Sequence, residues 1–289
     1  MSAALLASHV EAELLDAGEA AVPAEAWEAL AARAIEPNVF LASWMAQARL
    51  RHLPDQAGAR IAAAWRHTGT EKRLAGLMLL VRPRGRHYNP FPILRSAELY
   101  APLSTPLLDP ESPDESWSAL LAALRRAGIG AVAMPFMAVE GPAFGALLAA
   151  RNRDGLPLAA LESHRRAFLK SPLSGDDYLR THLERRRRKE AGRQKRRLGD
   201  LGELRFSVAR TGIDVAEALE LFLALEAAGW KGRAGTDIAA APGAAPYFRE
   251  IAREGSRRDA FRVALLTLDG RPIAAGLVAI GYYAWSDAR

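Results

Sequence analysis

The segment Leu221-Phe-Leu-Ala-Leu-Glu-Ala-Ala-Gly-Trp-Lys-Gly-Arg-Ala-Gly-Thr-Asp237 passes from an apolar run into a stretch that mixes glycines with polar side chains. Apolar residues at positions 215, 219, 222 and 225 recur at the spacing of an amphipathic helix. Gly229 stands where a glycine commonly terminates a helix. We therefore predict a helix over residues 215–228 that runs into a flexible loop carrying Trp230, Lys231, Arg233 and Thr236.

Just upstream, residues 185–197 form the most charged segment of the chain. They contain nine Lys and Arg residues and a single acidic one, Glu190, whereas the rest of the chain has 30 basic and 32 acidic residues. Since like charges four residues apart destabilise a helix, this segment indicates a site for an anion, with a solvated helix face as the alternative. No aromatic interleaving or recognition motif accompanies the charge, so it does not favour nucleic acid.

Around these two segments, predicted helices alternate with predicted strands, which indicates an α/β layered fold with mixed sheets flanked by helices. Residues 83–113 hold seven prolines and are expected to form short strands and loops. Ser171–Asp177 is a natural boundary between domains at 1–170 and 171–289, and Ser174 is placed to cap the next helix. The predicted helices span residues 22–34, 39–53, 115–126, 141–151, 176–198, 215–228 and 244–254, and the predicted strands span residues 60–66, 74–81, 130–135, 156–170, 203–209, 260–268 and 272–283.

Two short polar joints are typical of hairpins. The joint at residues 68–72 contains Gly69 and is slightly too long for a tight turn, whereas Asp269-Gly-Arg is a good hairpin turn.

Several classes of protein are excluded or disfavoured by what the sequence lacks. There are no cysteines, which excludes disulfides, thiolate catalysis and Cys-ligated zinc. The six histidines are scattered without metal-like spacing, and no serine-hydrolase, nucleotide-phosphate or dinucleotide motif is present, so no metal is expected. The N-terminus lacks the positive charge of a secretory signal, and no apolar run reaches the length of a membrane span, so a cytoplasmic protein is expected.

The polar residues of the opening segment support two interpretations. Glu226 lies one turn from the predicted helix end and can act as a general base if it is desolvated, while Lys231 and Arg233 hold an anion and Trp230 walls a pocket. In the alternative, Trp230 is a core residue, Glu226 pairs with Lys231, and the glycines only turn the chain.

Residues 225–236, Leu-Glu-Ala-Ala-Gly-Trp-Lys-Gly-Arg-Ala-Gly-Thr, resemble the signature of the CelD-like acetyltransferases, named for a cellulose biosynthesis protein and placed in the GNAT superfamily. Residues 101–109, 193–202 and 268–274 also fit that family, and the likeness runs from about Pro37 to Gly281. The family's phosphate-loop pattern matches Arg125-x-x-Gly128-x-Gly130, but these glycines follow a helix and lead into a strand, so we interpret them as a helix stop.

The resemblance implies tandem GNAT-like halves, the second of which transfers an acyl group from acetyl-CoA or another acyl-CoA to an amine or hydroxyl. The acceptor is then a small molecule or a saccharide, in polysaccharide or cell-envelope metabolism. On this reading Glu226 and Lys231 are catalytic. The resemblance also implies substrate contacts from Trp230, Arg233 and Thr236, and an anion or cofactor site made by Arg193, Arg196 and Arg197.

The sequence departs from the family pattern after Ala274. There the family continues into a Lys-x-x-Tyr-Asp-Glu-like segment and the elements that hold acyl-CoA, whereas this sequence stops at Arg289. We therefore expect an incomplete second half whose last hairpin is exposed and available for oligomerisation. The alternative function is a non-catalytic or truncated binding module that uses the basic helix at residues 185–197 to hold an anionic partner.

Overall fold

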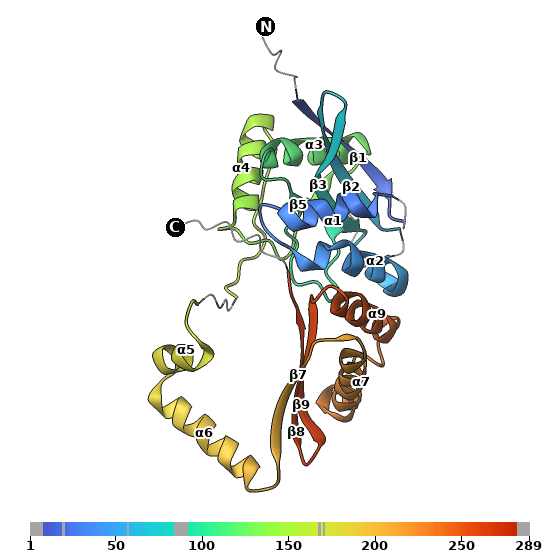
Figure 1. Ribbon diagram of the computed structural model, residues 1–289. Coiled ribbons are helices and arrows are strands. Elements are labelled where there is room, and N and C mark those ends of the chain that lie inside the picture. The colour runs from blue at the N-terminus through green and yellow to red at the C-terminus, as the bar shows by residue number, and fades with distance from the viewer. Residues whose placement is uncertain are drawn as a thin grey trace.

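The protein folds into two β-sheets, each covered by helices, and so confirms the expected mixed α/β layered fold (Figure 1). The computed structural model describes residues 8–18, 21–56, 58–83, 92–166, 169 and 171–281. Within these residues no helix is long and apolar enough to cross a membrane.

The first sheet has the strand order β1-β2-β3-β4-β6, and β5 pairs with β3 beside β4. Its strands are antiparallel except for β4 and β6, which run parallel. β2 and β3 are buried on both faces because one cluster of apolar residues packs with α1 and another with α3 and α4, which explains their near-continuous apolar sequences. The elements are β1 Ser8–Asp16, α1 Ala24–Arg33, β2 Arg60–Thr68, β3 Glu71–Val81, β4 Ile93–Ser96, β5 Leu107–Leu108, α3 Pro113–Arg126, β6 Ala131–Ala133 and α4 Pro142–Asp154.

The hairpin between β2 and β3 is tighter than the sequence suggested. Thr68 pairs with Glu71, so the turn consists of two residues, Gly69 and Thr70. Gly69 has a φ of 60°, a conformation that glycine adopts without strain. The longer turn predicted from the polar joint was wrong because Thr68, Glu71 and Lys72 belong to the paired strands.

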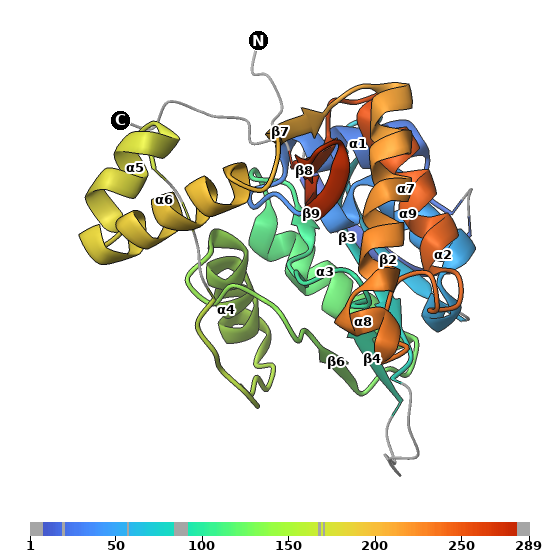
Figure 2. The same ribbon diagram turned by 90° about the horizontal axis from the view of Figure 1, so that it is seen from below.

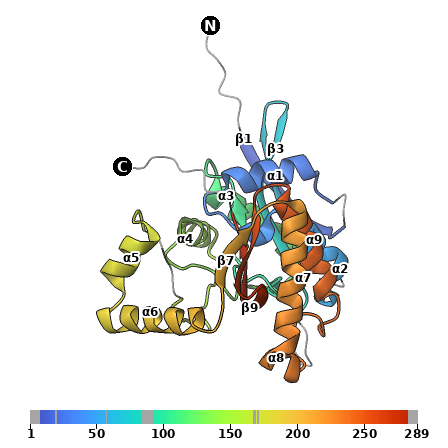
Figure 3. The same ribbon diagram turned by 60° about the horizontal axis from the view of Figure 1, so that its bottom comes forward.

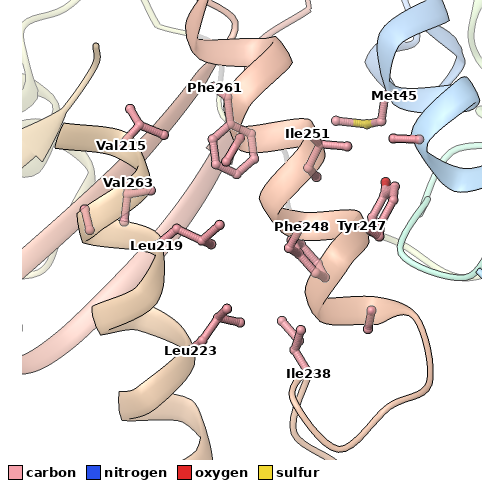
Figure 4. Packing of buried hydrophobic residues seen from close by; sticks show 14 of the residues in the cluster. Met45, Val215, Leu219, Leu223, Ile238, Tyr247, Phe248, Ile251, Phe261 and Val263 are labelled. Atoms are coloured by element: carbon pink, nitrogen blue, oxygen red, sulfur yellow. The ribbon is translucent and has the colours of Figure 1, made fainter. Parts of the chain in front are cut away.

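The second sheet has three antiparallel strands in the order β7-β8-β9, with α7 and α9 packed against one face. Leu219, Leu223, Ile251 and Val263 are among the buried residues that join the two helices to the sheet (Figure 4). Phe206 on β7 is 68% exposed, which leaves the other face largely open. The elements are β7 Leu204–Ala209, α7 Gly212–Ala228, α8 Trp230–Arg233, α9 Ala244–Ser256, β8 Phe261–Leu268 and β9 Arg271–Ala279.

Helix α2, Ser43–His52, packs into the cores under both sheets, although it comes before β2 in the chain. Met45 joins the core under the second sheet and lies beside α9 in Figure 4, whereas Ala46 joins the core of the first sheet. Arg51 and His52 on α2 both contact the Glu250 carboxylate on α9. The helix predicted from residue 39 begins only at Ser43, because a 3-10 turn, η1 Val39–Leu41, precedes it; a second such turn, η2 Pro54–Gln56, follows it.

The link between the sheets differs from the sequence prediction in two respects. Residues 156–166 form no strand, and Leu161 is 93% exposed, because no neighbouring strand pairs with this segment. The single helix expected over residues 176–198 is two helices, α5 Gly175–His182 and α6 Arg185–Gly199, since Leu183 adopts an extended conformation. The predicted cap is confirmed: Ser174 Oγ accepts a hydrogen bond from the Asp177 backbone N–H.

Candidate functional site

The glycine-rich segment after α7 is a helical turn rather than the flexible loop predicted from its composition. Gly229 adopts a φ of −83° and a ψ of −165°, not the left-handed conformation of a terminating glycine. The chain then forms α8, which folds back against the end of α7. Gly232 permits this contact, since a Cβ at that position would lie 1.7 Å from the Ala227 carbonyl oxygen.

Glu226, on the last turn of α7, is the residue around which α8 and the following residues gather. Its side chain is only 9% exposed, and both carboxylate oxygens have donors. Lys231 Nζ lies 2.5 Å from Oε1, and the Ile238 backbone N–H donates to Oε2 over 2.9 Å. A buried carboxylate is stable only with such partners, so α8 and the following residues build a site around one charge.

The other predicted substrate residues lie around the same turn but differ in exposure. Trp230 is 68% exposed, which overturns the interpretation of this side chain as a core residue, and its ring centroid lies 6.0 Å from Lys231 Nζ. Thr236 donates its backbone N–H to the Lys231 carbonyl over 2.9 Å, and so fixes the chain that follows α8. Arg233 is exposed at the end of α8. The structure therefore brings Glu226 and Lys231 together with Trp230, Arg233 and Thr236 in one turn.

Tyr100 is a residue of this site that sequence reasoning missed. It comes from the loop between β4 and β5, has a φ of 58°, and contacts the rings of Tyr247 and Phe248, whose centroids lie 6.1 Å and 5.0 Å from its own. Burial raises the pKa of the Tyr100 phenol, and the negative charge of Glu226 raises it further, while Lys231 lowers it. A bulky residue in the left-handed region is strained, so the surrounding contacts hold this side chain in place.

The sequence signal for Tyr100 was weak. The proline-rich stretch at residues 83–113 carries several aromatic residues, and Tyr88 and Phe91 lie outside the described residues. Nothing in the spacing shows which of these aromatics reaches the end of α7, because that contact depends on how the two sheets pack together.

The predicted anion-binding arginines lie elsewhere. Arg193, Arg196 and Arg197 are on α6, which buries none of its residues, and all three are exposed. Figures 2 and 3 show α6 on one side of the second sheet, with α7 and α8 on the other. The structure therefore does not bring these arginines next to Glu226 and Lys231.

The charge of α6 is mostly uncompensated in the part of the chain that the structure describes. Its one ion pair there is internal, between Arg193 and Glu190 over 2.7 Å. An open hollow along α6 is lined by six cationic side chains together with Glu190 and Gly192. Gly128, the glycine of the phosphate-loop pattern, has a φ of 76°. Together with its neighbours it closes α3, as the helix-stop interpretation predicted.

Comparisons with known proteins match one part of the chain to a family. Residues 185–281, about a third of the chain, match the family described as "Acetyltransferase (GNAT) domain". No curated protein matches the chain. A solved structure, described as a tandem GNAT protein from the clavulanic acid biosynthesis pathway without acetyl-CoA, is 15% identical over 94% of this chain and 76% of its own. Its TM-score is 0.35. The segment that contains α6, α7, α8 and the second sheet is thus similar to a GNAT acetyltransferase domain.

Proposed function

We propose that this protein is an acyltransferase of GNAT type that transfers an acyl group from an acyl-CoA to an amine or hydroxyl acceptor. The observation that carries the proposal is the environment of Glu226. A buried carboxylate is held from one side by a backbone N–H and touched from the other by an ammonium group that is 42% exposed, within the segment that matches the GNAT domain.

The geometry supports a role for Glu226 as general base. Because Lys231 reaches Oε1 from the solvent side, an acceptor amine can take its place there and transfer a proton to the carboxylate. The freed amine nitrogen attacks the thioester carbonyl, a C–N bond forms, and the C–S bond breaks. The acylated nitrogen gives up its extra proton to the departing CoA thiolate, and the Glu226 carboxyl releases to solvent the proton that it took.

The surrounding residues position the two substrates in this proposal. Tyr100, whose pKa is raised, stays protonated and can donate a hydrogen bond to a developing negative charge. Trp230 offers an exposed ring on which an acceptor can lie. Arg233 and the Thr236 hydroxyl provide a cation and a polar group at the same turn.

The acyl donor contributes the activated thioester, and its phosphates are the natural ligands of a cationic surface. Arg193, Arg196 and Arg197 fit phosphate by charge, but α6 lies across the second sheet from Glu226 in this structure. We propose that they hold the donor only if α5 and α6, which bury no residue, swing toward α7 when it binds.

We propose further that the chain is a CelD-like enzyme with tandem GNAT-like halves, divided near residue 170. The acceptor is then a saccharide or another small molecule of envelope or polysaccharide metabolism. The support is the likeness of residues 225–236 to that family and the placement of their polar groups in one turn.

The test measures acetyl-CoA binding by calorimetry and thiol release in the presence of a panel of amino sugars and polyamines. Glu226→Gln is expected to lower kcat by about 10²–10⁴-fold with intact donor binding, as expected for loss of a general base. Glu217→Gln, on an exposed position of the same helix, is the matched control and is expected to leave the rate unchanged. The proposal is contradicted if millimolar acetyl-CoA gives neither a heat of binding nor a thermal shift.

A second candidate function follows from α6 alone. Its exposed arginines, remote from Glu226, favour a module that binds an anionic partner without catalysis. Binding of polyphosphate, used as the probe, then weakens steeply with salt and is lost in a double Arg186→Glu, Arg187→Glu variant. Unchanged polyphosphate binding by that variant eliminates this candidate, and acetyl transfer by the wild type favours the first.

A further inference from the structure

The pairing of β1 with β2 brings together two histidines that lie far apart in the sequence. His9 on β1 is directly opposite His67 on β2, and Glu11 is two residues along β1. Because side chains alternate along a strand, His9, His67 and Glu11 occupy the same face of the sheet. The scattered spacing of the histidines gave no sign of this cluster, since antiparallel register and not sequence distance places them side by side.

The geometry of the three side chains is compact. The two imidazole rings stack with centroids 4.9 Å apart and an interplanar angle of 9°. His67 Nε2 lies 2.8 Å from Glu11 Oε1 but makes no hydrogen bond, although this nitrogen is buried. One ligand atom from each residue lies within 4.8 Å of the others, so three potential ligand atoms are gathered in one place.

We propose that His9, Glu11 and His67 form a binding site for one divalent transition-metal ion of the zinc type. Two imidazoles and a carboxylate are ligands that Zn²⁺ favours, and three protein ligands leave one position for water. Bond lengths of about 2.1 Å place tetrahedral ligand atoms roughly 3.4 Å apart, between the 2.8 Å that separates His67 Nε2 from Glu11 Oε1 and the 4.8 Å within which all three ligand atoms lie. His9 and Glu11 are both exposed, so their side chains have room to adjust around an ion.

The side chains around the cluster influence its affinity for a metal ion. Lys72 on β3 is the cross-strand partner of His67, and its ammonium lies 4.6 Å from the centroid of the Trp65 ring. The Trp65 indole N–H in turn donates to Glu13. The Lys72 charge is held on the ring yet repels a nearby cation, so its removal is expected to tighten metal binding. A bound ion ties the edge strand β1 to β2 and raises the thermal stability of the first sheet.

The test uses the full chain, without a histidine tag and stripped of metal with a chelator. Calorimetric titration with Zn²⁺ is expected to give one ion per chain, and Co²⁺ is expected to give the visible absorption of a four-coordinate site. His9→Ala, His67→Ala and Glu11→Gln are each expected to weaken Zn²⁺ binding by at least about tenfold, because a lost ligand costs more than the 10–100-fold of a lost supporting contact. Lys72→Met is expected to strengthen it.

His182→Ala is the matched control. It removes one histidine from α5, where the ring centroid lies 4.5 Å from that of Tyr178, and is expected to leave Zn²⁺ affinity unchanged. Circular dichroism of each variant without metal checks that the fold is retained. The proposal is overturned if the wild type shows no one-to-one Zn²⁺ binding. It is equally overturned if the His182 variant loses as much affinity as the His67 variant, or if Glu11→Gln and Lys72→Met both leave the affinity unchanged.

Discussion

The three glycines around α8 provide a sharp test of how this turn is built. A Cβ at Gly232 would lie 1.7 Å from the Ala227 carbonyl oxygen, well inside the roughly 3.5 Å separation of non-bonded atoms. Because the obstructing atom belongs to the backbone, no side-chain rotation relieves the clash, and α8 must move away from α7. Gly232→Ala is therefore expected to shift Lys231 relative to Glu226.

The expected change in the free energy of unfolding combines opposing effects. Forced backbone displacement costs about 1–3 kcal/mol, while the stiffer unfolded chain returns about 0.4–1 kcal/mol. A net loss of about 1–2 kcal/mol is expected for Gly232→Ala. Gly235 has a φ of 65° and open space around it. Gly235→Ala is therefore expected to cost about 1–2 kcal/mol of backbone strain, offset in part by the same gain of about 0.4–1 kcal/mol from the stiffer unfolded chain.

Gly229 serves as the internal control. It has an ordinary φ of −83°, and its Cβ would lie 3.3 Å from the Glu226 carbonyl oxygen, a tight contact that a shift of a few tenths of an ångström relieves, so Gly229→Ala is expected to cost less than Gly232→Ala. Urea denaturation of the three variants at constant m-value measures the free energy of unfolding, and acetyl transfer reports whether the surroundings of Glu226 are kept. The reasoning is refuted if Gly232→Ala is as stable and as active as Gly229→Ala.

Three further predictions concern other parts of the structure. Asp109 is fully buried and accepts from Arg33 over 2.9 Å, so Asp109→Asn is expected to lower the free energy of unfolding by about 2 kcal/mol in urea denaturation. Burial raises the Glu250 pKa, but hydrogen bonds from Arg51 and His52 outweigh it and hold the pKa below 4.5. Stability from this group is thus present above pH 4.5 and lost as the pH falls through the folded pKa, and Glu250→Gln is expected to flatten the acid side of the Tm profile. Tyr100→Phe is expected to lower kcat about 10²-fold with little change in KM, while Tyr178→Phe on α5 leaves both unchanged.

Several elements were predictable from sequence because the signal is local. The helix predicted at residues 115–126, the Ser174 cap and the Asp269–Gly270 turn each depend on residues a few positions apart, and all three are found, the helix beginning two residues earlier, at Pro113. The predictions that differ from the structure also applied local rules, which packing between distant segments overrides. Residues 156–166 have the composition of a strand but lack a partner. Helix α7 ends at Ala228 with Gly229 as its cap, as predicted, but Gly229 is not left-handed, and the chain continues into α8, which packs against Ala227.

The sequence alone determined the α/β class and the concentration of positive charge at residues 185–197, since these follow from residue type and spacing. Glu226, Lys231 and Trp230 became the best site candidates through the resemblance of residues 225–236 to the CelD-like family. Only the tertiary structure decided that Glu226 is buried between Lys231 and Ile238, that Tyr100 joins it from the first sheet, and that the α6 arginines lie on the far side of the second sheet. It likewise placed His9 opposite His67. The physical reason is that burial and pairing depend on contacts between distant segments, which are set by how sheets and helices pack and leave no periodic mark in the sequence.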